Sequence, residues 1–451
     1  MSITRKGSVT IMLALSMLMF LMFCLTLVEG TRVYYLRVKA EQAMELAAFS
    51  VLSEYQQELF DYYGVFFLDL DYEQGEEHIA VLEQRVSEYL EKNAGELTTE
   101  RLIAKNFRRG TDCGGIPFFR QAIEQIKVKS GYKFAEELLG DVGNLTNADV
   151  DLSEILNESA NAAEGLLGEY TDQEGIPQFQ ISLPRISFPT IDALTEAVIG
   201  NTEDLSDKVI NLDERILRRD LKKGIGIKAN TTLADMQLFH TYLFTYLDYY
   251  NSEHMGVLND ALKYQVEYVI SGKESDRKNL EDIMWRIFLS RAGGNYLFYH
   301  QDAEKMAKSE TEAIALVGVT GNAVLINLVR EIFLISQAIQ DGISETKQVF
   351  AGGEVPLYQN GVFSGVKLGY QEYLVIFLNT TKEMTKIYRC MDVIEMEVRK
   401  KSDCESFYLD HCTDFFEIDW SYQFQSLFKE IPFLNSKIYE NAIARKIFYE
   451  M

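Results

Sequence analysis

The N-terminal part of the chain is dominated by hydrophobic residues, and the run from about Ser8 to Val28 carries no charged side chain. At about 1.5 Å of rise per helical residue, this run reaches about 30 Å, the thickness of a bilayer core. The pattern predicts a transmembrane helix over residues 8–28. A cleaved signal peptide and a buried core helix are the alternatives. A signal peptide has a shorter apolar region and a small-residue cleavage site, which LVEGTRVYY lacks.

The apolar run continues into an amphipathic pattern over residues 29–63. Hydrophobic residues recur there every three or four positions, and no proline or glycine interrupts the segment from Thr31 to Tyr63. This spacing places them on one helix face: Leu36, Ala40, Ala43, Ala47, Val51, Tyr55 and Leu59. We therefore expect one long helix, with a stalk that follows the membrane span and ends before Gly64.

Basic residues flank the span on both sides. Arg5 and Lys6 favour a cytoplasmic N-terminus (residues 1–7), whereas Arg32, Arg37 and Lys39 argue for the opposite orientation. Long domains translocate largely regardless of charge. We expect an inside N-terminus and an extracytoplasmic body.

Beyond the stalk, the pattern predicts an α+β body in three parts: residues 64–142, a proline-rich connector over 143–200, and a helix-rich part over 201–451. Helices are predicted in EEHIAVLEQRVSEYLEKNAG, in a block that begins near Thr202, from Ser275 to Gly293–Gly294, and from Ala303 to about Val349. The last of these contains Arg330 and Glu331, which argues against a second membrane span.

Alternation of apolar residues with mainly polar ones predicts strands. The clearest case runs from Phe416 to Phe424, and a second runs from Tyr264 to Ile270. A shorter strand is expected in GVFFLDLDY, directly after Gly64. These strands are few, so we expect mixed or antiparallel pairing within a mainly helical body.

The charge of the chain excludes one class of partner. The protein has 44 basic and 68 acidic residues, and 39 basic against 67 acidic residues remain beyond residue 40, a net charge of −28. Such a body repels nucleic acid, so no nucleic-acid binding is expected.

Cysteine and metal chemistry is sparsely represented. Cys24 lies in the predicted span, and four cysteines remain for the body: Cys113, Cys390, Cys404 and Cys412. A local disulfide between Cys404 and Cys412 and free buried thiols are both consistent with this spacing. DLDYEQG does not have the spacing of an EF-hand loop, and the five histidines form no metal-binding motif. We predict no metal, no cofactor and no catalytic residue; the sequence leaves any small-molecule ligand undetermined.

Three segments carry a family resemblance. They are KGSVTIMLALSMLMFLMFCLTLVEGTRVYYLRVKAEQAMELAAFSVLSEYQQELFDYYGVFFLD, LKYQVEYVISGKESDRKNLEDIMWRIFLSRAGGNYLFY and LGYQEYLVIFLNTTKEMTKIYRCMDVIEMEVR. The first resembles the start of TadE/TadG-type pseudopilins of the tight-adherence (Tad, or Flp) pilus system. All three are similar to an uncharacterised Gram-positive family that shares this start. The resemblance implies a membrane-anchored, extracytoplasmic component of a pilus or secretion apparatus.

The resemblance also implies a processing site, with one departure. In such pilins the chain is cut after a glycine and glutamate is the fifth mature residue. Gly7 and Ser8 match the cleavage position, but the fifth residue is Met12. An anchored accessory or minor component is therefore favoured over a major filament subunit.

The leading hypothesis is a non-catalytic, pseudopilin-like structural protein whose partners are the membrane and proteins of the apparatus. Its candidate packing residues are Leu13, Leu15, Leu18 and Leu21 in the span and Leu36, Ala40, Ala43 and Ala47 in the stalk. These residues equally well face lipid or the protein's own body. The alternative function is a cell-surface adhesin or ligand-binding receptor.

Overall fold

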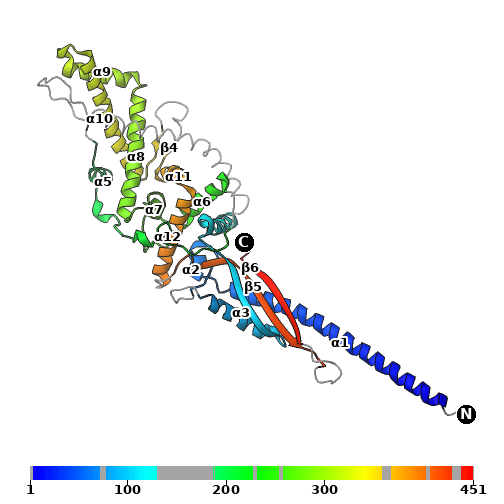
Figure 1. Ribbon diagram of the computed structural model, residues 1–451. Coiled ribbons are helices and arrows are strands. Elements are labelled where there is room, and N and C mark those ends of the chain that lie inside the picture. The colour runs from blue at the N-terminus through cyan, green and yellow to red at the C-terminus, as the bar shows by residue number, and fades with distance from the viewer. Residues whose placement is uncertain are drawn as a thin grey trace.

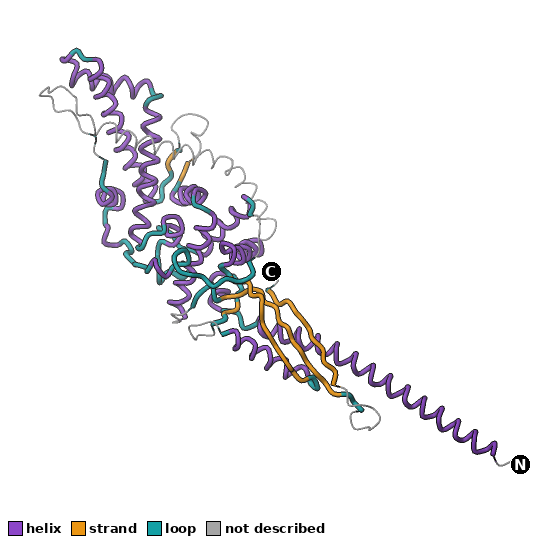
Figure 2. The backbone as a smooth tube through the Cα atoms, in the orientation of Figure 1, coloured by secondary structure: helices purple, strands orange, loops and turns teal. Residues whose placement is uncertain are grey.

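A computed structural model describes residues 4–71, 78–129, 186, 188–226, 231–252, 257–357, 367–402, 407–428 and 438–449, with side chains from Val9 onward. The molecule is elongated (Figures 1 and 2). Helix α1 (Thr4–Leu52) projects from one end, and α9 (Ala303–Val317) and α10 (Ala323–Phe350) lie at the other. The α+β class is confirmed.

An antiparallel sheet lies beside the C-terminal half of α1. Its central strand, β5 (Cys412–Gln425), pairs with β2 (Thr98–Arg109) along one edge. Strands β6 (Ile438–Phe448) and β1 (Leu68–Asp69) also pair with β5, and both run antiparallel to it. Because β2 occupies one edge, β6 and β1 share the other.

The strand predicted from Phe416 to Phe424 is confirmed as part of β5. Its alternating apolar side chains are all at most 2% exposed: Phe416, Ile418, Trp420, Tyr422 and Phe424. They join one hydrophobic core with α1 and with α3 (Ile79–Ala94). Period-two alternation thus reflects a sheet with one face covered by helices.

The stalk residues Leu36, Ala40, Ala43 and Ala47 belong to this same core, and each is at most 2% exposed. The hypothesis that they pack against another subunit is therefore wrong, because the protein's own α3 and sheet cover them. The long helix also ends earlier than predicted. It stops at Leu52, and a separate helix α2 (Gln57–Tyr63) follows after a turn in which the Gln56 N–H donates to the Phe67 carbonyl.

A large helical body is inserted between β2 and β5. It contains a helix over residues 112–129, α5 (Ile191–Ile199), α6 (Leu233–Tyr246), α7 (Gln265–Ser271), α8 (Asp276–Tyr299), α9, α10, α11 (Tyr370–Thr380) and α12 (Glu383–Ser402), with a short hairpin of β3 (Val355–Pro356) and β4 (Lys367–Leu368). A second hydrophobic core fills this body. The two ends of the insertion meet where the Gly110 N–H donates to the Cys412 carbonyl at 3.1 Å.

Several predicted elements differ from the structure. The strand predicted from Tyr264 to Ile270 is helix α7, because its polar residues are buried rather than solvated. Gln265 donates to the Leu258 carbonyl, and Glu267 accepts from Tyr370 Oη at 2.7 Å. The apparent alternation therefore did not mark a solvent face.

Glycine residues do not mark the ends of the helices in this region as predicted. Helix α8 does not stop at Gly293–Gly294 but continues to Tyr299, although its predicted start is confirmed, since Ser275 caps it by accepting the Lys278 N–H. A glycine is required instead at Gly342 of α10, where α10 passes close to α8. A Cβ at this position would lie 3.0 Å from the Ala292 backbone nitrogen. The predicted helix from Ala303 to Val349 is likewise interrupted by a turn at η3 (Gly318–Thr320).

The proline-rich connector falls mostly outside the described residues, and its last part is the helix α5. The block predicted to be helical from Thr202 forms only two short turns, η1 (Thr202–Asp204) and η2 (Leu212–Glu214). The side chains of Asn201 and Asn211 accept backbone N–H groups two residues on, which offers the chain an alternative to a helix.

Candidate functional site

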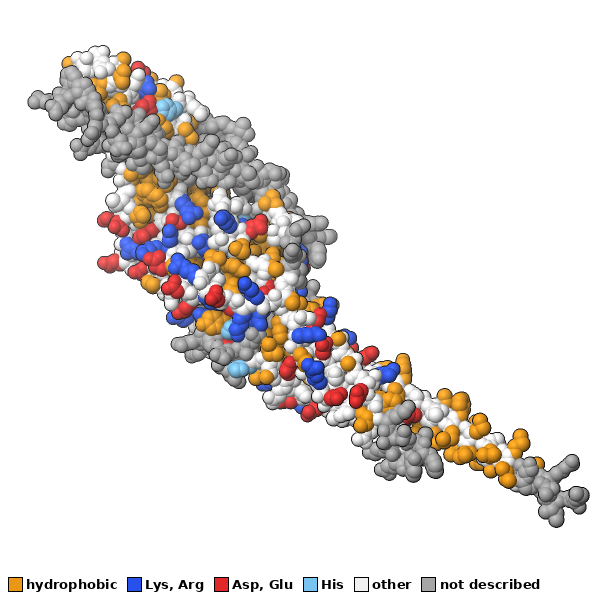
Figure 3. Space-filling view, viewed as in Figure 1, with side chains coloured by type: hydrophobic (Ala, Val, Ile, Leu, Met, Phe, Trp, Pro, Cys, Tyr) orange, Lys and Arg blue, Asp and Glu red, His pale blue; other side chains and the backbone are white. Residues whose placement is uncertain are grey.

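The projecting half of α1 is the first candidate site. Its apolar side chains are exposed along its length, as Figure 3 shows. The four span residues predicted to pack are 53–66% exposed: Leu13, Leu15, Leu18 and Leu21. A bare apolar surface of this length is stable only in lipid or against another protein.

Two helices among the described residues are long and apolar enough to cross a membrane, and they differ in setting. One is the Val9–Leu52 part of α1, whose most apolar stretch is not buried at all. The other is α10, which packs on α8 and α9 and whose Glu331 lies 2.9 Å from Arg330 and 3.0 Å from His300. We therefore assign α10 to the body and regard α1 as suited to a membrane anchor.

The described residues from Gln57 onward are called the head, and the head holds α1 at the point where the apolar run ends. Glu29 accepts the Leu427 N–H at 3.2 Å, and Arg32 donates to the Gln425 carbonyl at 2.9 Å. Arg32 also pairs with Glu96, with 2.5 Å between nitrogen and oxygen. These contacts tie the C-terminal end of β5 to the first turn after the apolar run.

Gly7 and Ser8, the predicted processing site, lie in the first turns of α1, and their side chains are outside the described residues. Cys404, one half of the predicted disulfide, is also outside them. Cys412 is a buried thiol at the start of β5 that donates to the Tyr408 carbonyl at 3.5 Å. Processing and disulfide formation both stay predictions.

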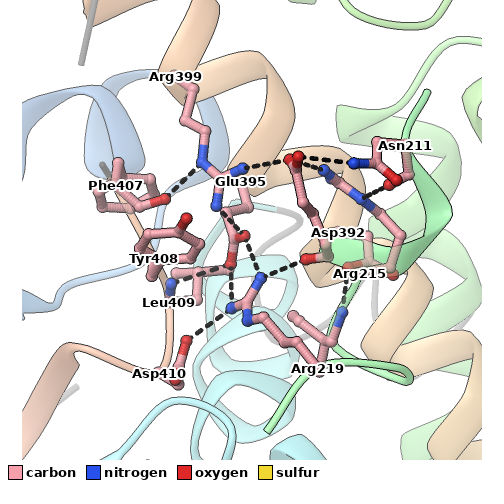
Figure 4. Close-up of polar contacts among 12 residues, drawn as sticks. Asn211, Arg215, Arg219, Asp392, Glu395, Arg399, Phe407, Tyr408, Leu409 and Asp410 are labelled. Atoms are coloured by element: carbon pink, nitrogen blue, oxygen red, sulfur yellow. Dashed lines mark hydrogen bonds and ion pairs between the residues drawn. The ribbon is translucent and has the colours of Figure 1, made fainter. Parts of the chain in front are cut away.

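A buried cluster of arginines and carboxylates is the second candidate site (Figure 4). Helix α12 contributes Asp392, Glu395 and Arg399, the segment after η2 contributes Arg215 and Arg219, and the loop before β5 contributes Asp410. Arg219 lies 2.6 Å from both Glu395 and Asp410. Arg399 donates to Glu395 at 2.5 Å, so Glu395, which has no exposed area, is held by two guanidinium groups.

An aromatic ring completes this cluster. The guanidinium of Arg399 lies 4.2 Å from the centre of the Tyr408 ring, and that of Arg219 lies 4.7 Å from it. Planar guanidinium groups over an aromatic face are attracted by its negative π surface. Tyr408 therefore fixes both arginines at the orientation in which they meet Glu395.

Burial and charge shift the pKa values in the cluster. Burial raises the pKa of Asp392 to about 7, although an N–H from Ile216 works against that shift. For Arg219, burial alone lowers the pKa, but the hydrogen bonds and charges of Glu395 and Asp410 outweigh it and raise the pKa above its ordinary value. Arg219 therefore stays charged, whereas Asp392 gains or loses its proton near neutral pH.

A pocket of about 830 Å³ lies beside this cluster. Four basic and two acidic side chains are among those that line it: Lys208, Arg215, Arg399, Lys400, Glu214 and Asp260. This local excess of positive charge contrasts with the net charge of −24 of the whole chain. Among the described residues, no group of three or more His, Cys, Asp or Glu side chains is arranged to hold a metal ion.

Neither the pocket nor the cluster is predicted from the sequence. A signal was present in MDVIEMEVRK, where Asp392 and Glu395 interrupt an otherwise apolar helix face. The arginines of DERILRRD fall in the block that was predicted to be helical, and their partners lie about 180 residues away in the chain, which no local pattern reveals.

The comparisons with known proteins place the pocket within one family segment. Residues 190–424, more than half of the 451 residues, match a family described as "Family of unknown function (DUF5702)". The chain belongs to the DUF5702 family. The DUF5702 segment contains all the residues of the arginine–carboxylate cluster and the central strand β5 up to Phe424, and α1, β2 and β6 lie outside it. No curated protein matches the chain, and no solved structure does.

Proposed function

We propose that this DUF5702 protein is a membrane-anchored, non-catalytic accessory component of a Tad-type pilus or secretion apparatus. The observation that carries the proposal is the continuity of α1, which is one helix from Thr4 to Leu52. Its first half exposes an apolar surface, and its second half packs one face against the head. An anchor of this kind holds the head at a fixed distance from the membrane.

The resemblance of the N-terminus to TadE/TadG-type pseudopilins supports the choice of apparatus. Met12 in place of the expected glutamate favours an accessory role over filament incorporation. The N-terminus is cytoplasmic and the head lies outside in this proposal. Partners dock laterally through the span, by way of Leu13, Leu15, Leu18 and Leu21.

Cysteine cross-linking in native membranes tests this role. In a Cys24→Ser background, Leu18→Cys and Leu21→Cys should each cross-link to components of the apparatus, whereas Phe49→Cys, exposed on α1 but beside the head, should not. Shearing intact cells separates the two pilin-like roles. A chain that keeps Met1 and stays in the membrane agrees with an accessory component, and a chain that begins at Ser8 in the sheared fraction contradicts it.

A ligand-binding receptor is the second candidate, and the pocket of about 830 Å³ favours it. In that case the span only tethers the head, and the cross-links in the membrane should be absent. An adhesin is a further form of the same alternative, since the head is exposed and acidic.

A further inference from the structure

We infer that the pocket beside η2 and α12 binds a small molecule through a carboxylate or phosphate group, with Arg215 and Arg399 as the recognition pair. The inference rests on the receptor alternative and not on the anchored role. Failure of ligand binding therefore leaves the cross-linking test of the anchored role unaffected.

Arg215 is the strongest sign of a ligand. Only 5% of this residue is exposed, and it lines the pocket. Its Nε donates to the Asn211 carbonyl at 2.9 Å, and its Nη2 donates to Glu214 at 3.4 Å. Its buried Nη1 has no hydrogen-bond partner among the described residues. A buried guanidinium nitrogen without an acceptor is costly, and a small rotation of this side chain toward an oxyanion in the pocket that it lines would remove that cost.

Arg399 presents a second guanidinium to the same space. Two of its nitrogens are fixed, because Nε donates to the Phe407 carbonyl at 2.7 Å and Nη2 to Glu395 at 2.5 Å. Its remaining nitrogen, Nη1, lies 3.9 Å from Glu214 Oε2, which is beyond a hydrogen bond. The side chain is thus held in place while one of its nitrogens stays available.

Glu214 occupies the position that a ligand oxyanion would take. One carboxylate oxygen, Oε2, faces Arg215 at 3.4 Å and Arg399 at 3.9 Å, and the side chain is 52% exposed. Both distances are long for a charge-assisted pair. An incoming carboxylate or phosphate can displace this half-solvated carboxylate and approach both arginines more closely, while Lys400 at the pocket lining adds further positive charge.

Calorimetric titration of the full-length protein in nanodiscs with inorganic phosphate, and separately with citrate, tests the inference. We expect saturable binding of at least one anion, weakened by added salt. Arg215→Gln should weaken it by about tenfold or more, because a charge-assisted hydrogen bond is lost. Glu214→Gln should tighten it, because the competing carboxylate is gone. Lys308→Gln, an exposed change on α9 far from the pocket, should leave it unaltered.

The two anions distinguish the chemistry of the ligand. Preference for phosphate indicates a phosphorylated ligand, and preference for citrate indicates a carboxylate. If Arg215→Gln does not fold, Glu214→Gln decides the matter, since its side chain is half exposed. The inference is overturned if neither anion binds saturably, or if Glu214→Gln binds no more tightly than the unaltered protein.

Discussion

The carboxylate of Glu29 accepts a hydrogen bond from the Leu427 backbone N–H, with 3.2 Å between Oε2 and N, although 398 positions separate the two residues. Glu29 is the first charged residue after the apolar run. The end of β5 is thus fastened to α1 where the apolar run ends, and Arg32 reinforces the contact one turn later. The head is thereby joined to α1 at a defined position along the helix.

The first prediction concerns this contact. Glu29→Ala should increase the hydrogen-exchange rate of the Leu427 amide about fivefold, as expected for loss of a hydrogen bond worth about 1 kcal/mol. The overall fold should persist, because the contact lies outside both cores. Glu45→Ala serves as the control, since it removes only an exposed pair with Arg445. Unchanged exchange at Leu427 would show that the head is not fastened there.

The second prediction separates the buried and the exposed face of the second half of α1. Ala43 is buried against the protein's own core, so Ala43→Leu should lower the free energy of unfolding by about 1–3 kcal/mol through overpacking. Leu46→Ala changes an exposed residue of the same helix and should have an effect below about 0.5 kcal/mol. Thermal unfolding in detergent measures both. Equal effects would contradict the packing of the stalk into the head.

The third prediction uses two neighbouring arginines. Arg219→Ala leaves Glu395 and Asp410 buried without their shared cation and should destabilise the fold by about 3–5 kcal/mol. Arg218 is 56% exposed and faces only the exposed Asp213, so Arg218→Ala should cost less than about 0.5 kcal/mol. Denaturant titration gives both values, and a mild effect of Arg219→Ala would mean that water screens the cluster.

The fourth prediction concerns pH. The pKa of Asp392 is about 7 in the folded protein and about 3.9 in an unfolded chain, so the folded state holds its proton between these values. The contribution of Asp392 to stability is therefore greatest at low pH and is lost as the pH rises from about 4 through 7.

Asp392→Asn should remove this dependence. Its melting temperature relative to the unaltered protein should rise between pH 5 and pH 8, and Asp213→Asn, on an exposed side chain, should show no such trend. A difference that stays constant with pH would show that Asp392 is ionised throughout.

The pattern of apolar and polar residues predicts an element correctly where one of its faces is in contact with solvent. The strand from Phe416 to Phe424 and the helix near Ile79–Ala94 each have one buried and one partly exposed side, and both were predicted. The pattern failed at α7, where Gln265 and Glu267 are wholly buried and hydrogen-bonded. Burial on all sides removes the period that distinguishes a helix from a strand.

Contacts between segments far apart in the sequence explain the remaining differences between the predicted and the observed structure. Strands β2 and β5 pair across the whole inserted body, so the small sheet and its helix α1 come from the two ends of the chain. The cluster around Glu395 is assembled in the same way, from segments near residues 215, 395 and 410. A single sequence shows the residue types at these places but not that they meet.

The most direct test of the anchored arrangement is the labelling of Cys113 with a membrane-impermeant maleimide on intact cells. Cys113 is exposed on the head, whereas Cys390 and Cys412 are buried. The account predicts that the protein is labelled before lysis and that Cys113→Ser removes most of this signal. Labelling of Cys113 only after the cells are lysed would place the head inside the cell and contradict the account.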